Sequence, residues 1–224
     1  MYAGLLFFVN ESIMEIVTAL KLYNSLLNIE YELTLGHKGI LKKLRIIFDK
    51  SCWFHLAGIH YLNDIDIIQN HRATEKFYDE ILSGQIKEDY FKKSTKYNDI
   101  QERVALASKP NEIIEAIDNK LVTIYSFSRS RTKFYTTIDG DYLICDFRIN
   151  SSPINLFLVF EKIDDNTVKP MSIFYPQLDD RSNGFLNYAD GQPKYTLLLS
   201  TKIYTLSAKS EEIFRHPLYT ENSK

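Results

Sequence analysis

The spacing of apolar residues divides the chain into a mixed first part, a helical middle and a strand-rich end. In the first part, apolar residues recur at helical spacing over 13–26, and Ser12 with Glu15 resembles a capping box that opens this helix. Residues 29–35 then alternate apolar with polar side chains, which predicts a half-buried strand. A turn leads into a returning strand over 40–48, so a helix followed by a β-hairpin is expected here.

The middle part, residues 50–119, has the periodicity of several helices. The first is expected over 51–62 and has apolar side chains on almost every side, which is typical of a central, buried helix. The remaining helices are expected over 73–82, 86–93 and 99–107 and from Pro110 onward, where the proline occupies a first-turn position.

The last part is rich in β-branched and aromatic residues and predicts strands over 121–127, 134–138, 142–149, 154–163, 168–175 and 195–206. Asp139-Gly140 is a hairpin signal, and short turns between regular strands favour an antiparallel meander. We therefore expect one α+β domain with helices packed against a curled antiparallel sheet. Within it, residues 1–49 form the helix and hairpin, 50–206 the helices and main sheet, and 207–224 a frayed polar tail.

Charge narrows the function classes. The chain has 27 Lys and Arg against 29 Asp and Glu, a net charge of −2. This near-neutrality argues against a protein that coats duplex DNA by bulk charge, but it permits a small local basic cleft. Positive charge concentrates at 38–50, where protection of an edge strand is the commoner explanation, and at 129–133. Fifteen Tyr and fourteen Phe favour strands and flat packing surfaces.

The apolar start, residues 3–9, is too short for a membrane span and lacks the basic leader of a signal peptide. We therefore expect a soluble cytoplasmic protein without a membrane partner. The sequence contains no phosphate loop, GxGxxG, HExxH or GxSxG motif. Cys52 and Cys145 each lie in an apolar run and are expected to be small buried hydrophobes. Exposed positions without a chemical role are the commoner outcome for three of the histidines: His37, His71 and His216.

His55 and His60 are the other two histidines. Five residues on a helix turn the chain by about 500°, so the two rings are expected to point about 140° apart and not to share a metal ion. His55 lies within the helix that should be buried. A buried neutral imidazole needs either a structural hydrogen bond or a cleft, and the sequence leaves both open.

Residues 126–137 carry three cations and no acid, with hydroxyl and aromatic side chains between them. If this segment is extended, Arg129, Arg131, Lys133 and Tyr135 share one face. Such a face suits a phosphodiester with bases stacked on the neighbouring rings. The alternative is a solvated loop between two strands.

The run from Phe48 to Ile65 resembles the signature FHLxG(I/L)xxLxDI of prophage-associated nucleases with the BECR (barnase, EndoU, colicin and RelE-like) fold. The resemblance covers 30–206 and continues in Glu75-Lys76-Phe77-Tyr78, Gln101-Glu102-Arg103 and Ser172-Ile173-Phe174-Tyr175. It implies helices followed by a four-stranded antiparallel sheet whose concave face holds RNA. It also implies a metal-independent ribonuclease without a cofactor, in which the ribose 2′-hydroxyl attacks the adjacent phosphate.

Only His55 is carried over from the motif itself, as the acid or base. Residue chemistry and position in the expected fold add Arg103 as a phosphate-side cation, and Arg131 and Lys133 as stabilisers of the transition state. Tyr175 is a candidate acid or stacking partner. The candidate RNA contacts are Lys50, Arg129 and Tyr135.

Three functions are consistent with these sequence features. The first is an endoribonuclease acting as a phage-linked toxin or in phage–host conflict, with RNA as substrate and a protein inhibitor or antitoxin as a candidate partner. The second is a non-catalytic module of the same fold that binds RNA or protein through the basic segment. The third is an interaction protein that docks a partner through its aromatic surface.

Overall fold

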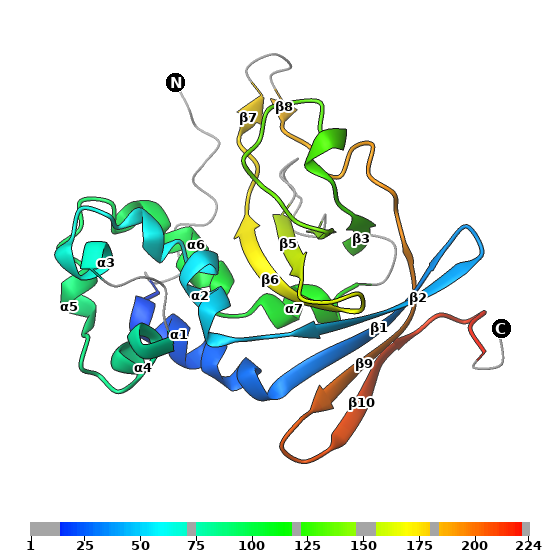
Figure 1. The fold of residues 1–224 in the computed structure, drawn as a ribbon, viewed down its shortest axis with the longest axis horizontal. Coiled ribbons are helices and arrows are strands. Elements are labelled where there is room, and N and C mark those ends of the chain that lie inside the picture. Colours follow the sequence, from blue (N-terminus) through cyan, green and yellow to red (C-terminus); the bar gives the residue numbers. More distant parts are fainter. Residues whose placement is uncertain (1–13, 71–74, 118–121, 147–155, 180–183, 221–224) are drawn as a thin grey trace.

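The computed structural model describes residues 14–70, 75–117, 122–146, 156–179 and 184–220. A group of helices lies at one end of a long curled sheet (Figure 1). The helices are α1 (Ile16–Asn24), α2 (Lys50–Leu56), α3 (Asp66–Asn70), α4 (Glu75–Leu82), α5 (Glu88–Phe91), α6 (Gln101–Ala107) and α7 (Pro110–Glu115). Single 3-10 turns are η1 (Ser25–Asn28), η2 (Ile59–Tyr61), η3 (Asn98–Ile100) and η4 (Arg129–Arg131).

The main sheet has eight strands in the order β10-β9-β1-β2-β6-β5-β4-β3. Their bounds are β1 (Ile29–His37), β2 (Ile40–Ile47), β3 (Val122–Ser126), β4 (Tyr142–Asp146), β5 (Leu156–Lys162), β6 (Thr167–Phe174), β9 (Thr196–Tyr204) and β10 (Lys209–Arg215). A separate small hairpin joins β7 (Leu178–Asp179) to β8 (Gly184–Phe185).

One parallel pair joins the two halves of this sheet. Neighbouring strands are antiparallel except β2 and β6, which pair only at Arg45 with Thr167 and Ile46 with Val168. After Ile47 the chain leaves the sheet and enters α2, which packs against β6. Helix α2, which follows β2 in the sequence, therefore packs against β6, the strand that pairs with β2 in the sheet.

Both faces of the β3–β6 half are covered, and this explains its apolar sequence. Tyr142 and Ile144 of β4 belong to the main core, whereas Leu143 and Cys145 belong to a second cluster with Phe157, Val159 and Tyr188. Cys145 and Cys52 are both free and buried, as the sequence predicts. Burial raises the pKa of the Cys52 thiol to about 12, so this thiol is protonated and unreactive at neutral pH.

The α+β class, the N-terminal helix and the following hairpin are confirmed. The predicted strand over 134–138 is wrong, because these residues form irregular chain between η4 and β4. Here side-chain hydroxyls form hydrogen bonds with nearby backbone groups, in place of the bonds that a neighbouring strand would make. The Thr132 hydroxyl contacts the carbonyls of Arg129 and Phe134, and the Thr136 hydroxyl accepts from the Ile138 amide. The tail is also not frayed throughout, since 209–215 form β10 against β9.

Several predictions fall outside the described residues. They concern the apolar start at 3–9, Ser12 of the capping box, His71, and the strand ends at 147–149 and 154–155. Within the part of the chain that the structure does describe, no helix has both the length and the apolar character needed to cross a membrane.

Candidate active site

Helix α2 carries the motif histidine and begins with a side-chain cap. Asp49 has extended backbone, and its carboxylate accepts from the Cys52 amide at 2.9 Å and from the Ser51 hydroxyl at 2.5 Å. Trp53 and Leu56 are buried on the inner face of the helix. His55 is on the opposite side and is exposed, so the expectation that it is buried within a central helix is wrong.

Helix α2 ends at Leu56 rather than continuing to Leu62. Gly58 has φ of +72°, and its amide donates to the His55 carbonyl at 3.1 Å, which is a glycine-terminated helix end. The chain then turns into η2 and returns His60 toward His55, so that the ring centroids are 5.2 Å apart. The predicted divergence of these two rings is therefore wrong, because it assumed an unbroken helix.

Arg103 of α6 closes this turn from the other side. Its guanidinium donates to the His55 carbonyl at 3.2 Å and to the Ser172 hydroxyl of β6 at 3.4 Å. It also lies over the Tyr61 ring, with its central carbon 5.3 Å from the centroid. Arg103 thus satisfies a carbonyl at the end of α2 and fixes a positive charge between α2, η2 and β6.

A second cation approaches from the sheet. Lys169 of β6 lies opposite Glu161 of β5, and its ammonium group is 3.2 Å from the Glu161 carboxylate and 3.5 Å from Asp49. These contacts raise the pKa of Lys169 against the effect of its partial burial, so it is charged at neutral pH. It therefore links the sheet to the residue that caps α2.

These neighbours set the protonation of the two histidines. The His55 ring is partly covered although the residue is exposed, and this partial burial lowers its pKa; Glu161 opposes this, while Arg103 and Lys169 lower the pKa further. Burial, followed by the charges of His55 and Arg103, lowers the pKa of His60 to about 4. Both imidazoles are therefore neutral at pH 7, and the positive charge of Arg103 acts on both of them.

The geometry can be compared with known families. The model of the family described as phage-Barnase-EndoU-ColicinE5/D-RelE like nuclease 4 matches residues 15–216. The chain belongs to this nuclease family. The resemblance predicted from the sequence is thereby confirmed, and the match extends from the helical end of the structure to the last strand. Searches of the curated proteins and of the solved structures return no match.

The structure brings together two of the site residues predicted from the sequence, His55 and Arg103. Tyr175 lies one residue beyond β6, three after Ser172, and is half-buried against the main core. Lys50, the first residue of α2, pairs with Asp79 at 2.7 Å.

The basic segment lies elsewhere in this nuclease fold. Arg129 and Arg131 belong to η4, which follows β3 at the edge of the sheet, three strands from β6. Lys133 pairs with Asp190 at 2.6 Å, and Tyr135 is 88% exposed. The segment is not a strand, so these four side chains do not share a strand face; the alternative of a solvated loop is correct.

Five residues near His55 were not predicted from the sequence: His60, Tyr61, Glu161, Lys169 and Ser172. Glu161 and Lys169 are charged residues within predicted strands, but only the strand register shows that they lie opposite each other. A β-bulge between Val159 and Phe160 shifts that register before Ser172. His60 could have been found by treating Gly58 as a helix end.

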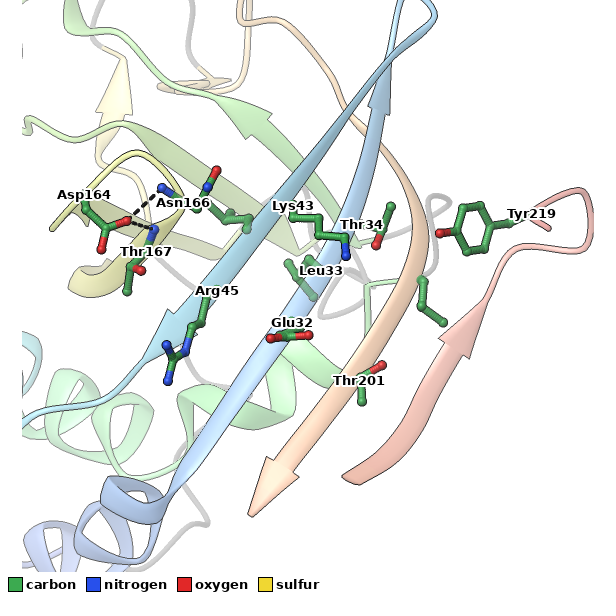
Figure 2. A pocket seen from close by; sticks show the side chains of 12 residues that line it. Glu32, Leu33, Thr34, Lys43, Arg45, Asp164, Asn166, Thr167, Thr201 and Tyr219 are labelled. Atoms are coloured by element: carbon green, nitrogen blue, oxygen red, sulfur yellow. Dashed lines mark hydrogen bonds between the residues drawn. The ribbon is translucent and has the colours of Figure 1, made fainter. Parts of the chain in front are cut away.

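A cavity of about 700 Å³ lies away from this site, on the face of β1, β2 and β9 (Figure 2). Lys43 and Arg45 line it, but so do Glu32 and Asp164, and Arg45 is held at 2.7 Å by Glu30. The charged side chains that line it balance. The cavity therefore has no excess of positive charge for a phosphate chain, and it contains neither of the paired histidines.

Proposed function

We propose that the chain is an endoribonuclease that cleaves RNA without a metal ion, by attack of the 2′-hydroxyl on the adjacent phosphate. The observation that carries this proposal is the cluster at the end of α2, in which Arg103 donates to the backbone carbonyl of His55 and the charges of Arg103 and Lys169 both lower the pKa of the His55 ring. This reaction needs a base, an acid and positive charge for the developing phosphorane, and the cluster supplies the base and the charge.

His55 is the base in this proposal. Its lowered pKa leaves the imidazole free at pH 7 to accept the proton of the 2′-hydroxyl. The 2′-oxygen then forms a bond to phosphorus while the bond from phosphorus to the 5′-oxygen breaks. The products are a 2′,3′-cyclic phosphate and a 5′-hydroxyl that has taken up a proton. Tyr175, next to the end of β6, remains the predicted proton donor or stacking partner.

Arg103 and Lys169 stabilise the charge on the phosphate oxygens. Neither moves freely, because Arg103 is anchored on the carbonyl of His55 and on Ser172, and Lys169 is held between Glu161 and Asp49. Fixed donors need little reorganisation when the transition state forms, which is the main source of electrostatic catalysis.

The other predicted contacts concern binding rather than chemistry. Arg129, Arg131, Lys133 and Tyr135 lie beyond β3, and we propose that they hold RNA away from the scissile phosphate. Lys50 lies on the same helix as His55, and in this proposal it contacts the RNA closer to the scissile phosphate. We extend the proposal to a cytoplasmic enzyme of phage–host conflict whose activity a protein inhibitor restrains.

The test is cleavage of a fluorescent RNA in the presence of EDTA, beside the same RNA with 2′-O-methyl groups and the same sequence as DNA. We expect cyclic-phosphate ends from RNA only. His55→Ala should abolish cleavage, whereas His216→Ala, directly after β10 and outside the His55 cluster, should retain it. Cleavage of the methylated RNA or loss of activity in EDTA would contradict the proposal, and salt-sensitive RNA binding without cleavage would support a binding module instead.

A further inference from the structure

The paired histidines form a contact that the motif does not require, because His60 occupies an unspecified position in FHLxG(I/L)xxLxDI. The His60 ring lies 5.2 Å from the ring of His55, 4.1 Å from that of Tyr61 and 6.3 Å from that of Phe54, between centroids. Three aromatic neighbours thus surround it. Its position depends on Gly58, whose left-handed backbone turns η2 back onto α2.

His60 is built to stay neutral. Its Nδ1 atom is buried and has no hydrogen-bond partner among the described residues. In the neutral ring this nitrogen can be the acceptor, and leaving it unpaired is tolerable. In the charged ring it would be a buried N–H donor, which needs an acceptor. A hydrogen bond with the Phe54 backbone favours the charged ring, but burial and the charges of His55 and Arg103 outweigh it.

The charges that face the pair come from three other elements. Glu161 of β5 favours a proton on His55, while Lys169 of β6 and Arg103 of α6 oppose it. Tyr61 of η2 lies against the His60 ring and under Arg103. The acidic neighbour acts on His55 and not on His60, whereas Arg103 opposes charge on both.

We propose that His60 is a positioning residue for His55: its neutral ring fixes the orientation of the His55 ring, excludes water from one side of it, and limits the pair to a single proton. This inference rests on the proposed function for its meaning but not for its test. Because both rings are neutral near pH 7, His55 is present in its base form throughout the neutral pH range. A proton that enters the pair below that range goes to His55.

In this proposal the two rings have different roles. His55 exchanges the proton with the substrate, and His60 supplies a rigid neutral surface. A ring without a titrating nitrogen should therefore replace His60, whereas a small side chain should not. His60→Phe retains a ring against Phe54 and Tyr61, and His60→Ala removes it.

The experiment follows the carbon-bound ring protons of His55 and His60 by NMR from pH 8 to pH 4. In the wild-type chain we expect His55 to titrate first and His60 to remain neutral until about pH 4. His60→Ala should raise the pKa of His55 toward its usual value, because water reaches the ring; His60→Phe should leave it lowered. His55→Gln should raise the pKa of His60, because one charge that opposes its protonation is gone.

Two results would overturn the inference: both rings taking up protons together near pH 6.5, or His60→Ala leaving the titration of His55 unchanged. Thermal unfolding of each variant shows whether the fold is intact, and His60→Phe provides the test if His60→Ala unfolds. The pH profile of RNA cleavage should shift in His60→Ala and return in His60→Phe. Since the NMR titration needs no activity, a chain without nuclease activity would refute the proposed function and still test this inference.

Discussion

Gly58→Ala should damage both the fold and the site, because Gly58 ends α2 and touches Arg103. At φ of +72°, an alanine pays the left-handed penalty of about 1–2 kcal/mol. Its Cβ would also lie 3.1 Å from Cδ of Arg103 and 3.2 Å from Cδ2 of Tyr61. Both distances are shorter than the contact distance of about 3.5–4.0 Å that carbon atoms prefer. Arg103 must therefore move.

Gly84→Ala is the matched control. Gly84 follows the end of α4 as Gly58 follows the end of α2, with φ of +79°, but nothing lies within 4 Å of its added Cβ. Gly84→Ala should be less stable than the wild-type chain only by the left-handed backbone penalty. Gly58→Ala should lose about 1 kcal/mol more, the net worth of one hydrogen bond of the displaced Arg103. If that energy also supports the transition state, kcat/KM falls roughly fivefold.

The two variants are compared by urea unfolding, for stability, and by steady-state cleavage of RNA, for kcat/KM. We expect Gly84→Ala to cleave like the wild-type chain and Gly58→Ala to be slower as well as less stable. Equal stability and equal kcat/KM in the two variants would refute the reasoning, since it would show that Arg103 adapts to the added methyl group without loss.

Three further predictions concern charge. Arg103→Lys keeps a cation but not the fork that reaches both the His55 carbonyl and Ser172, so kcat should fall about 10–100-fold, measured by single-turnover cleavage. Glu88→Gln should cost about 1–3 kcal/mol in urea unfolding, because this buried carboxylate accepts from the Ile16 and Val17 amides and from Tyr97. The lowered pKa of His60 stabilises the fold above pH 6.5, and this part of the free energy of unfolding should be lost as the pH falls from 6.5 through about 4. Urea unfolding at pH 7, 5 and 4 measures it. The free energy of unfolding should fall less in His60→Phe than in the wild-type chain, because the phenylalanine ring does not titrate.

Patterns that act over a few residues predicted the fold well. The alternation over 29–35 and the turn after it gave the β1–β2 hairpin, because both signals are local. The same reasoning failed at 134–138, where β-favouring residues are present but the hydroxyls of Thr132 and Thr136 bond nearby backbone groups. Composition alone does not show which hydrogen bonds the backbone will make.

The site was predictable only in part, since it is assembled from distant strands. His55 and Arg103 could be named from the motif and from residue chemistry. Lys169 and Glu161 could not, because their approach to His55 depends on the register of β5 with β6 and on the packing of α2 against β6. His60 was misplaced because a single glycine changed the end of a helix.

The two-residue parallel ladder between β2 and β6 also governs when the site can form. It closes a loop of roughly 120 residues, at an entropic cost of about 4 kcal/mol beyond the constant term, which packing of the helices must offset. The approach of Lys169 to His55 spans a similar stretch of chain. At about 5–20 residues per second, synthesis delivers Lys169 roughly 6–20 s after His55. A growing chain therefore carries His55 and Arg103 for several seconds before Lys169 exists, and the complete cluster cannot form until β6 has been synthesised.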